Sequence, residues 1–103
     1  MIIYNVTVSI DHNVHDDWLE WMKQVHIPDV MATGAFLENK ISKVLADQDE
    51  GGITYAIQYI SADMETYERY QKEHAPRLQQ EHNSRYEGKF AAFRTLLEVV
   101  HSQ

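Results

Sequence analysis

The feature that most constrains the fold is an amphipathic helix interrupted by a proline, which reads WLEWMKQVHIPDVMATG over residues 18–34. Apolar side chains recur there at intervals of three and four residues, which is typical of a helix with one buried face. They are Val14, Trp18, Trp21, Met22 and Val25. Pro28 lacks an amide hydrogen and restricts the residue before it, so we expect the helix to kink or restart there and to end at Gly34. A face that carries two tryptophans must be covered, and we expect both to pack in the core.

Strands that can cover this face lie on both sides of the helix in the sequence. Residues 2–10 alternate between two sets of side chains, one of them apolar, which predicts a half-buried strand. Residues 35–46 are more polar and contain lysine, as expected of an edge strand, and residues 53–60 alternate again after the turn-forming segment DQDEGG. Residues 90–100 have the pattern of a last strand.

A second helix is predicted between the third and fourth strands, where Asp63 can cap its start, Pro76 interrupts it and Gly88 ends it. The order is therefore βαββαβ. Two βαβ halves joined by a hairpin form a ferredoxin-like α+β fold, with a four-stranded antiparallel sheet and two kinked helices on one face. We expect residues 1–103 to form a single domain of this kind.

The second face of the predicted sheet also carries apolar side chains, because the strands have apolar groups on both sides. A sheet face of this kind normally marks an interface. A chain of this length buries only about 60 to 70% of the surface that its unfolded form exposes. We therefore expect a homodimer packed through the sheet face, that is, a dimeric α+β barrel.

Charge and composition exclude several classes of partner. The net charge is -7 and no run of lysine or arginine opposes it, so neither nucleic acid nor an anionic membrane is an expected partner. The absence of cysteine excludes disulfides and thiolate metal sites, and the N-terminus alternates like a strand instead of resembling a signal peptide. We expect a cytoplasmic protein. The six histidines show no HExxH or similar spacing, so no metal is assigned.

Two residues are candidate ligand-binding groups because of their own chemistry. His26 lies beside the proline interruption, where freed backbone groups and an imidazole can face a ligand, although a capping or packing role also fits. Arg94 interrupts an apolar strand, and a buried guanidinium needs a carboxylate or a ligand. Glu38, Glu98 or a carboxylate of a partner subunit are the structural alternatives for Arg94.

The succession MIIYNVTV, WLEWM, HIPDV, GGITYA, YERY, EHAP and FRTLLE resembles an uncharacterised family of short bacterial proteins, a domain of unknown function with a HIPDV motif. The resemblance covers nearly the whole chain. That family is similar in turn to the dimeric α+β barrel superfamily, which includes antibiotic-biosynthesis monooxygenases, haem-degrading monooxygenases and muconolactone-isomerase-like proteins. The resemblance implies the fold and the dimer, and it transfers no activity, because fold does not determine function.

The resemblance also implies candidate residues. Haem-degrading members of the superfamily use a histidine on the second helix with an asparagine on the first strand, and this chain has His74 and Asn5 there. Those proteins use a tryptophan on the third strand, where this chain has Tyr55 and Tyr59, and this departure weighs against haem. A cofactor-free oxygenase needs only a pocket whose donors stabilise an oxyanion, which Tyr55, Asn5 and Arg94 can supply.

Two functions follow from the sequence. One is a small-molecule-binding or assembly module without catalysis or a cofactor, whose ligand is small and apolar or aromatic. The other is a monooxygenase or isomerase, cofactor-free or haem-dependent, acting on a small aromatic or polyketide-like substrate. A pocket on which Asn5, His74, Arg94 and one of the two tyrosines converge favours the enzyme, and a filled interior with a salt-bridged arginine favours the module. The candidate ligand-binding residues are Asn5, His26, Tyr55, Tyr59, His74 and Arg94.

Overall fold

The computed structural model describes residues 1–45 and 51–103. Most of the predicted turn DQDEGG lies outside the described residues. In chain order the elements are β1 (Ile2–Asp11), the short helix η1 (His12–Val14), α1 (His15–Trp21), the π-helical turn η2 (Met22–His26), α2 (Ile27–Ala32), β2 (Glu38–Lys43), β3 (Gly52–Ser61), α3 (Met64–Glu73), α4 (Ala75–Arg85) and β4 (Phe90–Glu98).

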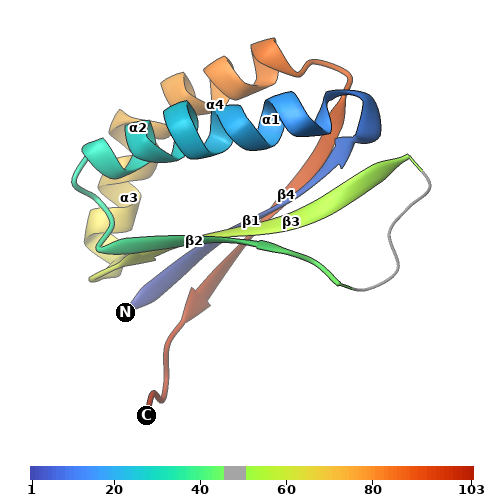
Figure 1. Cartoon of the computed structure of the whole chain (residues 1–103). Helices are drawn as coiled ribbons and strands as arrows, with labels where there is room; N and C mark the ends of the chain where they lie inside the picture. The colour runs from blue at the N-terminus through green and yellow to red at the C-terminus, as the bar shows by residue number, and fades with distance from the viewer. Residues whose placement is uncertain (46–50) are drawn as a thin grey trace.

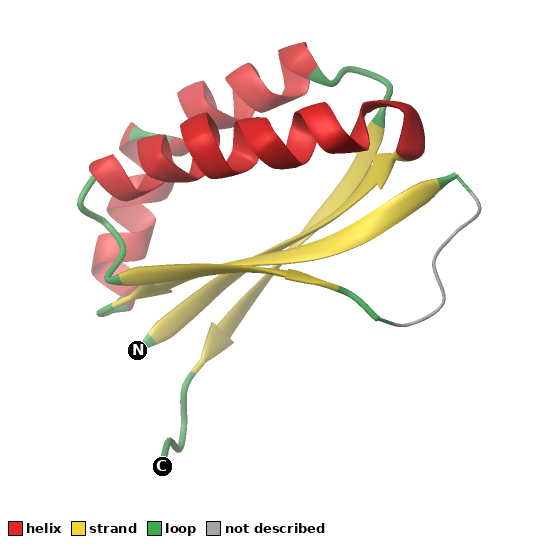
Figure 2. Cartoon of the chain, viewed as in Figure 1, coloured by secondary structure: helices red, strands yellow, loops and turns green. Residues whose placement is uncertain are grey.

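The strands form one antiparallel sheet in the order β2-β3-β1-β4. The helices all lie on the same face of this sheet, and its other face is left bare (Figures 1 and 2). This arrangement is the ferredoxin-like α+β fold, so the predicted fold class is confirmed. The predicted edge position of the second strand is confirmed as well, because β2 ends the sheet. Within the described ranges, no helix is long and apolar enough to cross a membrane.

Alternation along β1 separates the two faces of the sheet. Tyr4 and Val8 are each 3% exposed and pack beneath the helices, in the same cluster as Trp18, which is fully buried. Asn5 and Thr7 point to the other face, where the Asn5 amide donates a hydrogen bond of 3.0 Å to the Thr7 hydroxyl. The core therefore lies between the helix layer and one face of the sheet.

The first helix accommodates Pro28 by forming a π-helical turn just before it. The Ile27 amide donates to the Met22 carbonyl five residues earlier, and Pro28 follows in the first turn of α2, where a missing amide hydrogen costs little. The five-residue step brings Met22 and Ile27 to the buried side and turns Val25 outward, with 41% of Val25 exposed. The expectation that Val25 belongs to the buried face is therefore wrong, because it assumed an uninterrupted α-helical period.

The second helix is divided into α3 and α4, which meet at His74 and run in different directions (Figure 1). Asp63 caps α3 as predicted, by accepting a 2.8 Å hydrogen bond from the amide of Thr66. Pro76 lies in the first turn of α4, so the predicted interruption is also present. Gly88 has a φ of 75° in the turn between α4 and β4, a conformation that glycine adopts without strain.

Candidate functional site

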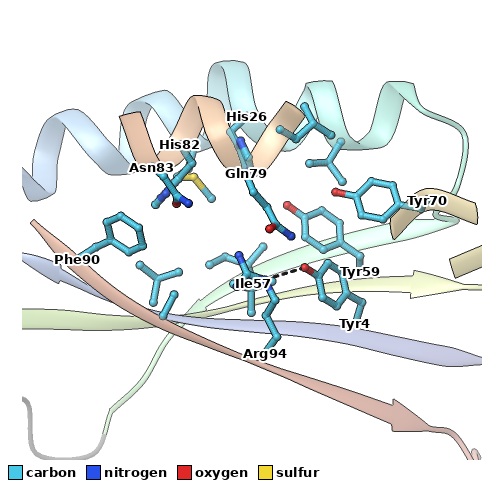
Figure 3. Close-up of a pocket in the computed structure, with 16 residues that line it drawn as sticks. Tyr4, His26, Ile57, Tyr59, Tyr70, Gln79, His82, Asn83, Phe90 and Arg94 are labelled. Carbon is cyan, nitrogen blue, oxygen red and sulfur yellow. Dashed lines mark hydrogen bonds between the residues drawn. The ribbon is translucent and has the colours of Figure 1, made fainter. Parts of the chain in front are cut away.

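A cavity of about 40 Å³ lies between the helix layer and the sheet and opens to solvent (Figure 3). Much of its wall is apolar, and the aliphatic side chains that line it are Val6, Val8, Met22, Val30, Ile57 and Leu78. Space of this size holds a few water molecules. A small ligand fits if it extends through the opening or if the flexible Met22 side chain changes rotamer.

Tyrosines form one side of the cavity. Tyr4, Tyr59 and Tyr70 line it, and the ring of Tyr4 lies 6.1 Å from that of Tyr59 and 6.2 Å from that of Tyr70. Burial raises the pKa of Tyr59 and of Tyr70, and the neighbouring tyrosines raise both pKa values further. The phenol groups therefore stay protonated at neutral pH and can donate hydrogen bonds to a ligand.

Arg94 lines the cavity from β4 and is exposed. Its Nε donates a 3.0 Å hydrogen bond to the hydroxyl of Tyr4, drawn as a dashed line in Figure 3. The side chain projects from the helix-facing side of β4, where Leu96 is also 40% exposed, so the helices leave this part of the strand uncovered. Neither Glu38 nor Glu98 forms an ion pair with it, and the described ranges contain no salt bridge to Arg94. Its guanidinium is therefore available to a carboxylate.

Two histidines lie in the helix layer, on the side of the cavity opposite Arg94 (Figure 3). His82, on α4, is 7% exposed, and its Nε2 accepts a 2.9 Å hydrogen bond from the indole of Trp18. His26 ends the π-helical turn, stacks on Trp21 at 5.2 Å and meets the His82 ring edge to face at 5.8 Å. Burial, together with the nearby His82, lowers the pKa of His26 to about 4. Burial also lowers the pKa of His82, against a hydrogen bond with Asn83 that raises it.

The structure divides the candidate residues predicted from the sequence. His26, Tyr59 and Arg94 line this cavity. Tyr55 does not, because its hydroxyl lies 2.8 Å from Nε2 of His15 and its ring packs on Trp18.

The remaining two candidates lie elsewhere. Asn5 points to the bare sheet face, where it bonds to Thr7. His74 lines a separate depression with Arg69 and Glu73 between the end of α2 and α3. The pair that the haem resemblance implied, Asn5 and His74, therefore does not converge on one pocket. Neither the cavity nor the depression contains both residues, so they do not fit haem.

Several lining residues were not identified from the sequence. His82 continues the apolar stripe of α4, because it follows the buried residues Ala75 and Leu78 by seven and four positions. Extending the helical period by one turn identifies it. Tyr4 belongs to the apolar set of the alternating strand 2–10, but nothing in the strand pattern distinguishes it from a core residue. The other polar or aromatic lining residues that were not identified from the sequence as site residues include Tyr70, Gln79 and Asn83.

Solved structures with the same fold include proteins of several kinds. A dimeric ferredoxin-like protein from an uncultured marine organism aligns with a TM-score of 0.72 at 15% identity, over 100% of this chain and 98% of that one. A mutant of SnoaB, a cofactor-independent oxygenase from Streptomyces nogalater, aligns with a TM-score of 0.69 at 9% identity, over 98% of this chain and 95% of that one. A candidate antibiotic biosynthesis monooxygenase from Deinococcus radiodurans aligns with a TM-score of 0.68 at 17% identity, over 100% of this chain and 96% of that one.

These identities are low, so the structural similarity establishes the fold and no activity. No curated protein matches the sequence. The predicted resemblance to an uncharacterised family is confirmed by a family model that matches residues 1–100, which is nearly the whole chain. The chain belongs to the DUF4286 family, a domain of unknown function.

Proposed function

We propose that this protein is a cytoplasmic small-molecule-binding module whose cavity takes a small aromatic or apolar acid. The observation that carries the proposal is the guanidinium of Arg94, which lines a largely apolar cavity, is hydrogen-bonded to Tyr4 and has no carboxylate partner in the described part of the chain. A carboxylate accepts two parallel hydrogen bonds from a guanidinium. The apolar wall then holds the rest of the ligand.

The charge of the whole molecule supports this interpretation. The chain has a net charge of -7, with 16 acidic residues against 9 basic ones. An arginine in such a chain has many possible carboxylate partners. Arg69 and Arg85 pair with theirs, and the exposed Arg77 forms no ion pair with another described residue. Arg94 instead lies against a tyrosine hydroxyl, which orients Nε and leaves the terminal nitrogens for a ligand.

Benzoate and its neutral analogue benzamide test the proposal by calorimetric titration. We expect benzoate to bind more tightly than benzamide, and Arg94→Gln to weaken benzoate at least about 10-fold, because a hydrogen bond to a charged group contributes about 1.5 to 3 kcal/mol. Arg69→Gln is the matched control, since Arg69 lies outside this cavity and pairs with Glu65. Equal affinities for benzoate in wild type and Arg94→Gln would refute the proposal.

A second candidate function is that of a cofactor-free monooxygenase or isomerase. It is supported by the hydroxyls of Tyr4, Tyr59 and Tyr70 and the guanidinium of Arg94, which line one cavity and can stabilise an enolate or phenolate. The fold similarity to a cofactor-independent oxygenase is compatible with it.

The test of this second function is oxygen uptake with a phenolic ketone that has an acidic methylene. One oxygen atom forms the new carbonyl, the other leaves as water, and the substrate supplies the electrons. Uptake no faster than without protein rejects this function for that substrate class.

We also propose that the module is a homodimer packed through the bare face of its sheet. Phe93 and Leu97 point to that face from β4 and are 63% and 41% exposed, and Ile3 and Ile60 lie on the same face. One similar solved structure is described as a dimeric ferredoxin-like protein. A second copy of the chain would remove these side chains from water.

A further inference from the structure

The π-helical turn Met22–His26 places an imidazole at the cavity. Single π turns within α-helices are rare and occur frequently at functional sites. Here the wider turn ends at His26, which lines the cavity together with Met22, the first residue of the same turn. With an α-helical period the step from Met22 to the next buried residue would be three or four positions instead of the observed five, to Ile27.

Nδ1 of His26 is a buried polar atom without a hydrogen-bond partner. It stands alone in this respect among the buried side-chain nitrogens and oxygens of the described residues. An unpaired polar atom in such a position costs about 1 to 3 kcal/mol, so native structures normally satisfy it. The aromatic neighbours of His26 do not do so: Trp21 stacks on the ring face, and Nε2 of His82 is already bonded to Trp18.

The chemical state of the ring decides what Nδ1 can accept. Burial and the adjacent His82 lower the pKa of His26 to about 4, so the imidazole is neutral at pH 7. A neutral imidazole has one N–H donor and one acceptor nitrogen. If the donor is Nε2, Nδ1 is a buried hydrogen-bond acceptor on a residue that lines the cavity, and a ligand hydroxyl that enters beside it can donate to it.

We propose that Nδ1 of His26 accepts a hydrogen bond from a hydroxyl of the bound ligand, and that the ligand is therefore a hydroxylated aromatic acid. This inference rests on the proposed function, in which Arg94 holds the carboxylate. Figure 3 places His26 in the helix layer and Arg94 on the sheet, on opposite sides of the cavity. The two groups then bind the two ends of one ligand: the acid at β4 and the hydroxyl at the π-helical turn.

The test compares benzoate, 3-hydroxybenzoate, 4-hydroxybenzoate and the methyl ethers of the two hydroxy acids. We expect at least one hydroxy acid to bind wild-type protein about 3- to 10-fold more tightly than benzoate, in line with one neutral hydrogen bond. Its methyl ether, which cannot donate, should lose this advantage. His26→Phe keeps an aromatic ring against Trp21 and should also abolish it, whereas His101→Phe, at an exposed position near the C-terminus, should retain it.

Nitrogen-15 NMR of the imidazole gives an independent measurement, because accepting a hydrogen bond shifts the signal of an unprotonated nitrogen upfield. The preferred hydroxy acid should shift the Nδ1 signal of His26, and benzoate should not. If neither hydroxy acid gains affinity over benzoate, or if the gain survives in His26→Phe, the inference is overturned. Loss of benzoate binding in Arg94→Gln, measured separately, shows that the proposed function stands even when this inference fails.

Discussion

At the scale of single residues, the hydrogen bond between Trp18 and His82 fixes the state of an imidazole inside the molecule. Nε2 of His82 accepts the indole hydrogen, so the neutral ring carries its proton on Nδ1. Protonation would place a second donor on Nε2, opposite the indole N–H, and the hydrogen bond would be lost. His26 lies next to it with a lowered pKa. The pKa of each ring is lowered in the folded protein, so protonation of either ring at acidic pH favours the unfolded state.

We expect the free energy of unfolding to fall as the pH drops from 6.5 towards 4. The unfolded chain binds a proton at His26 near pH 6.5, whereas the folded chain binds it only near pH 4, so protons favour the unfolded state in this window. Stability should be independent of this histidine above pH 6.5, and the loss should reach about 2 to 3 kcal/mol near pH 4. Urea denaturation at pH 7 and 4.5 measures it.

His26→Phe provides the comparison for this pH dependence, because carboxylates also titrate in the acidic range. The variant should lose less stability than wild type between the two pH values, while His12→Phe, at an exposed position, should behave like wild type. Identical profiles for wild type and His26→Phe would show that His26 titrates normally in the folded protein.

The sequence identified some residues of the site because their chemistry conflicts with their surroundings. A histidine beside a proline and an arginine within an apolar strand both violate a local pattern, and His26 and Arg94 do line the cavity. Asn5 and His74 were inferred from other proteins. In this chain Asn5 points to the bare face of the sheet, whereas His74 lies at the break between α3 and α4, so the two residues do not meet. Nothing local reveals which tyrosine faces a cavity and which, like Tyr55, is bonded to a histidine.

At the scale of elements, the close approach of two backbones restricts which residue can occupy the start of β3. Gly52 pairs with Asp11 at the end of the ladder between β1 and β3. A Cβ atom there would lie 2.8 Å from the carbonyl oxygen of Ile10 and 2.9 Å from the hydroxyl of Ser9. The carbonyl belongs to the backbone of a central strand, so it cannot move without disturbing the ladder.

Gly52→Ala should therefore destabilise the protein by about 1 to 3 kcal/mol, the usual cost of forcing extra atoms into a packed region. Gly51→Ala is the matched control, because a Cβ on Gly51 meets no atom within 4 Å, and we expect a change within about 0.5 kcal/mol. Chemical denaturation of both variants gives the difference. Equal stability of the two would mean that β1 moves aside at little cost.

The elements themselves were largely predictable, because period-2 and period-3.6 patterns report which side of a strand or helix is buried. The π-helical turn was not, since it depends on how the chain accommodates Pro28 while keeping Ile27 and Val30 in the core. A periodicity count assumes a constant number of residues per turn. It therefore fails for Val25, which lies within the turn where the period changes.

At the scale of the whole molecule, the bare sheet face predicts self-association. Sedimentation velocity at micromolar concentration should give the mass of two chains. Phe93→Lys places a charge on the proposed interface and should shift the protein towards the monomer. Leu45→Lys is the control, since Leu45 is 90% exposed and lies outside the strands. A wild-type protein that sediments as a single chain would contradict the dimer.

The fold was predictable at this scale because few topologies connect βαββαβ with short, right-handed crossovers. The cavity was not, because its volume depends on how the side chains of the helices and strands around it pack together. Sequence periodicity identifies which faces meet and gives no information on how completely they fill the space between them.

Alternation along β1 also has a thermodynamic consequence. Tyr4 lines the cavity and the next residue, Asn5, points to the face where the second copy would pack, so the backbone of one strand is all that separates the two surfaces. A ligand that shifts the backbone at Tyr4 also shifts Asn5 beneath the dimer contact. Ligand affinity and dimerisation should then be linked equilibria, each changing the other by the same factor. Titrations at several protein concentrations would measure that factor.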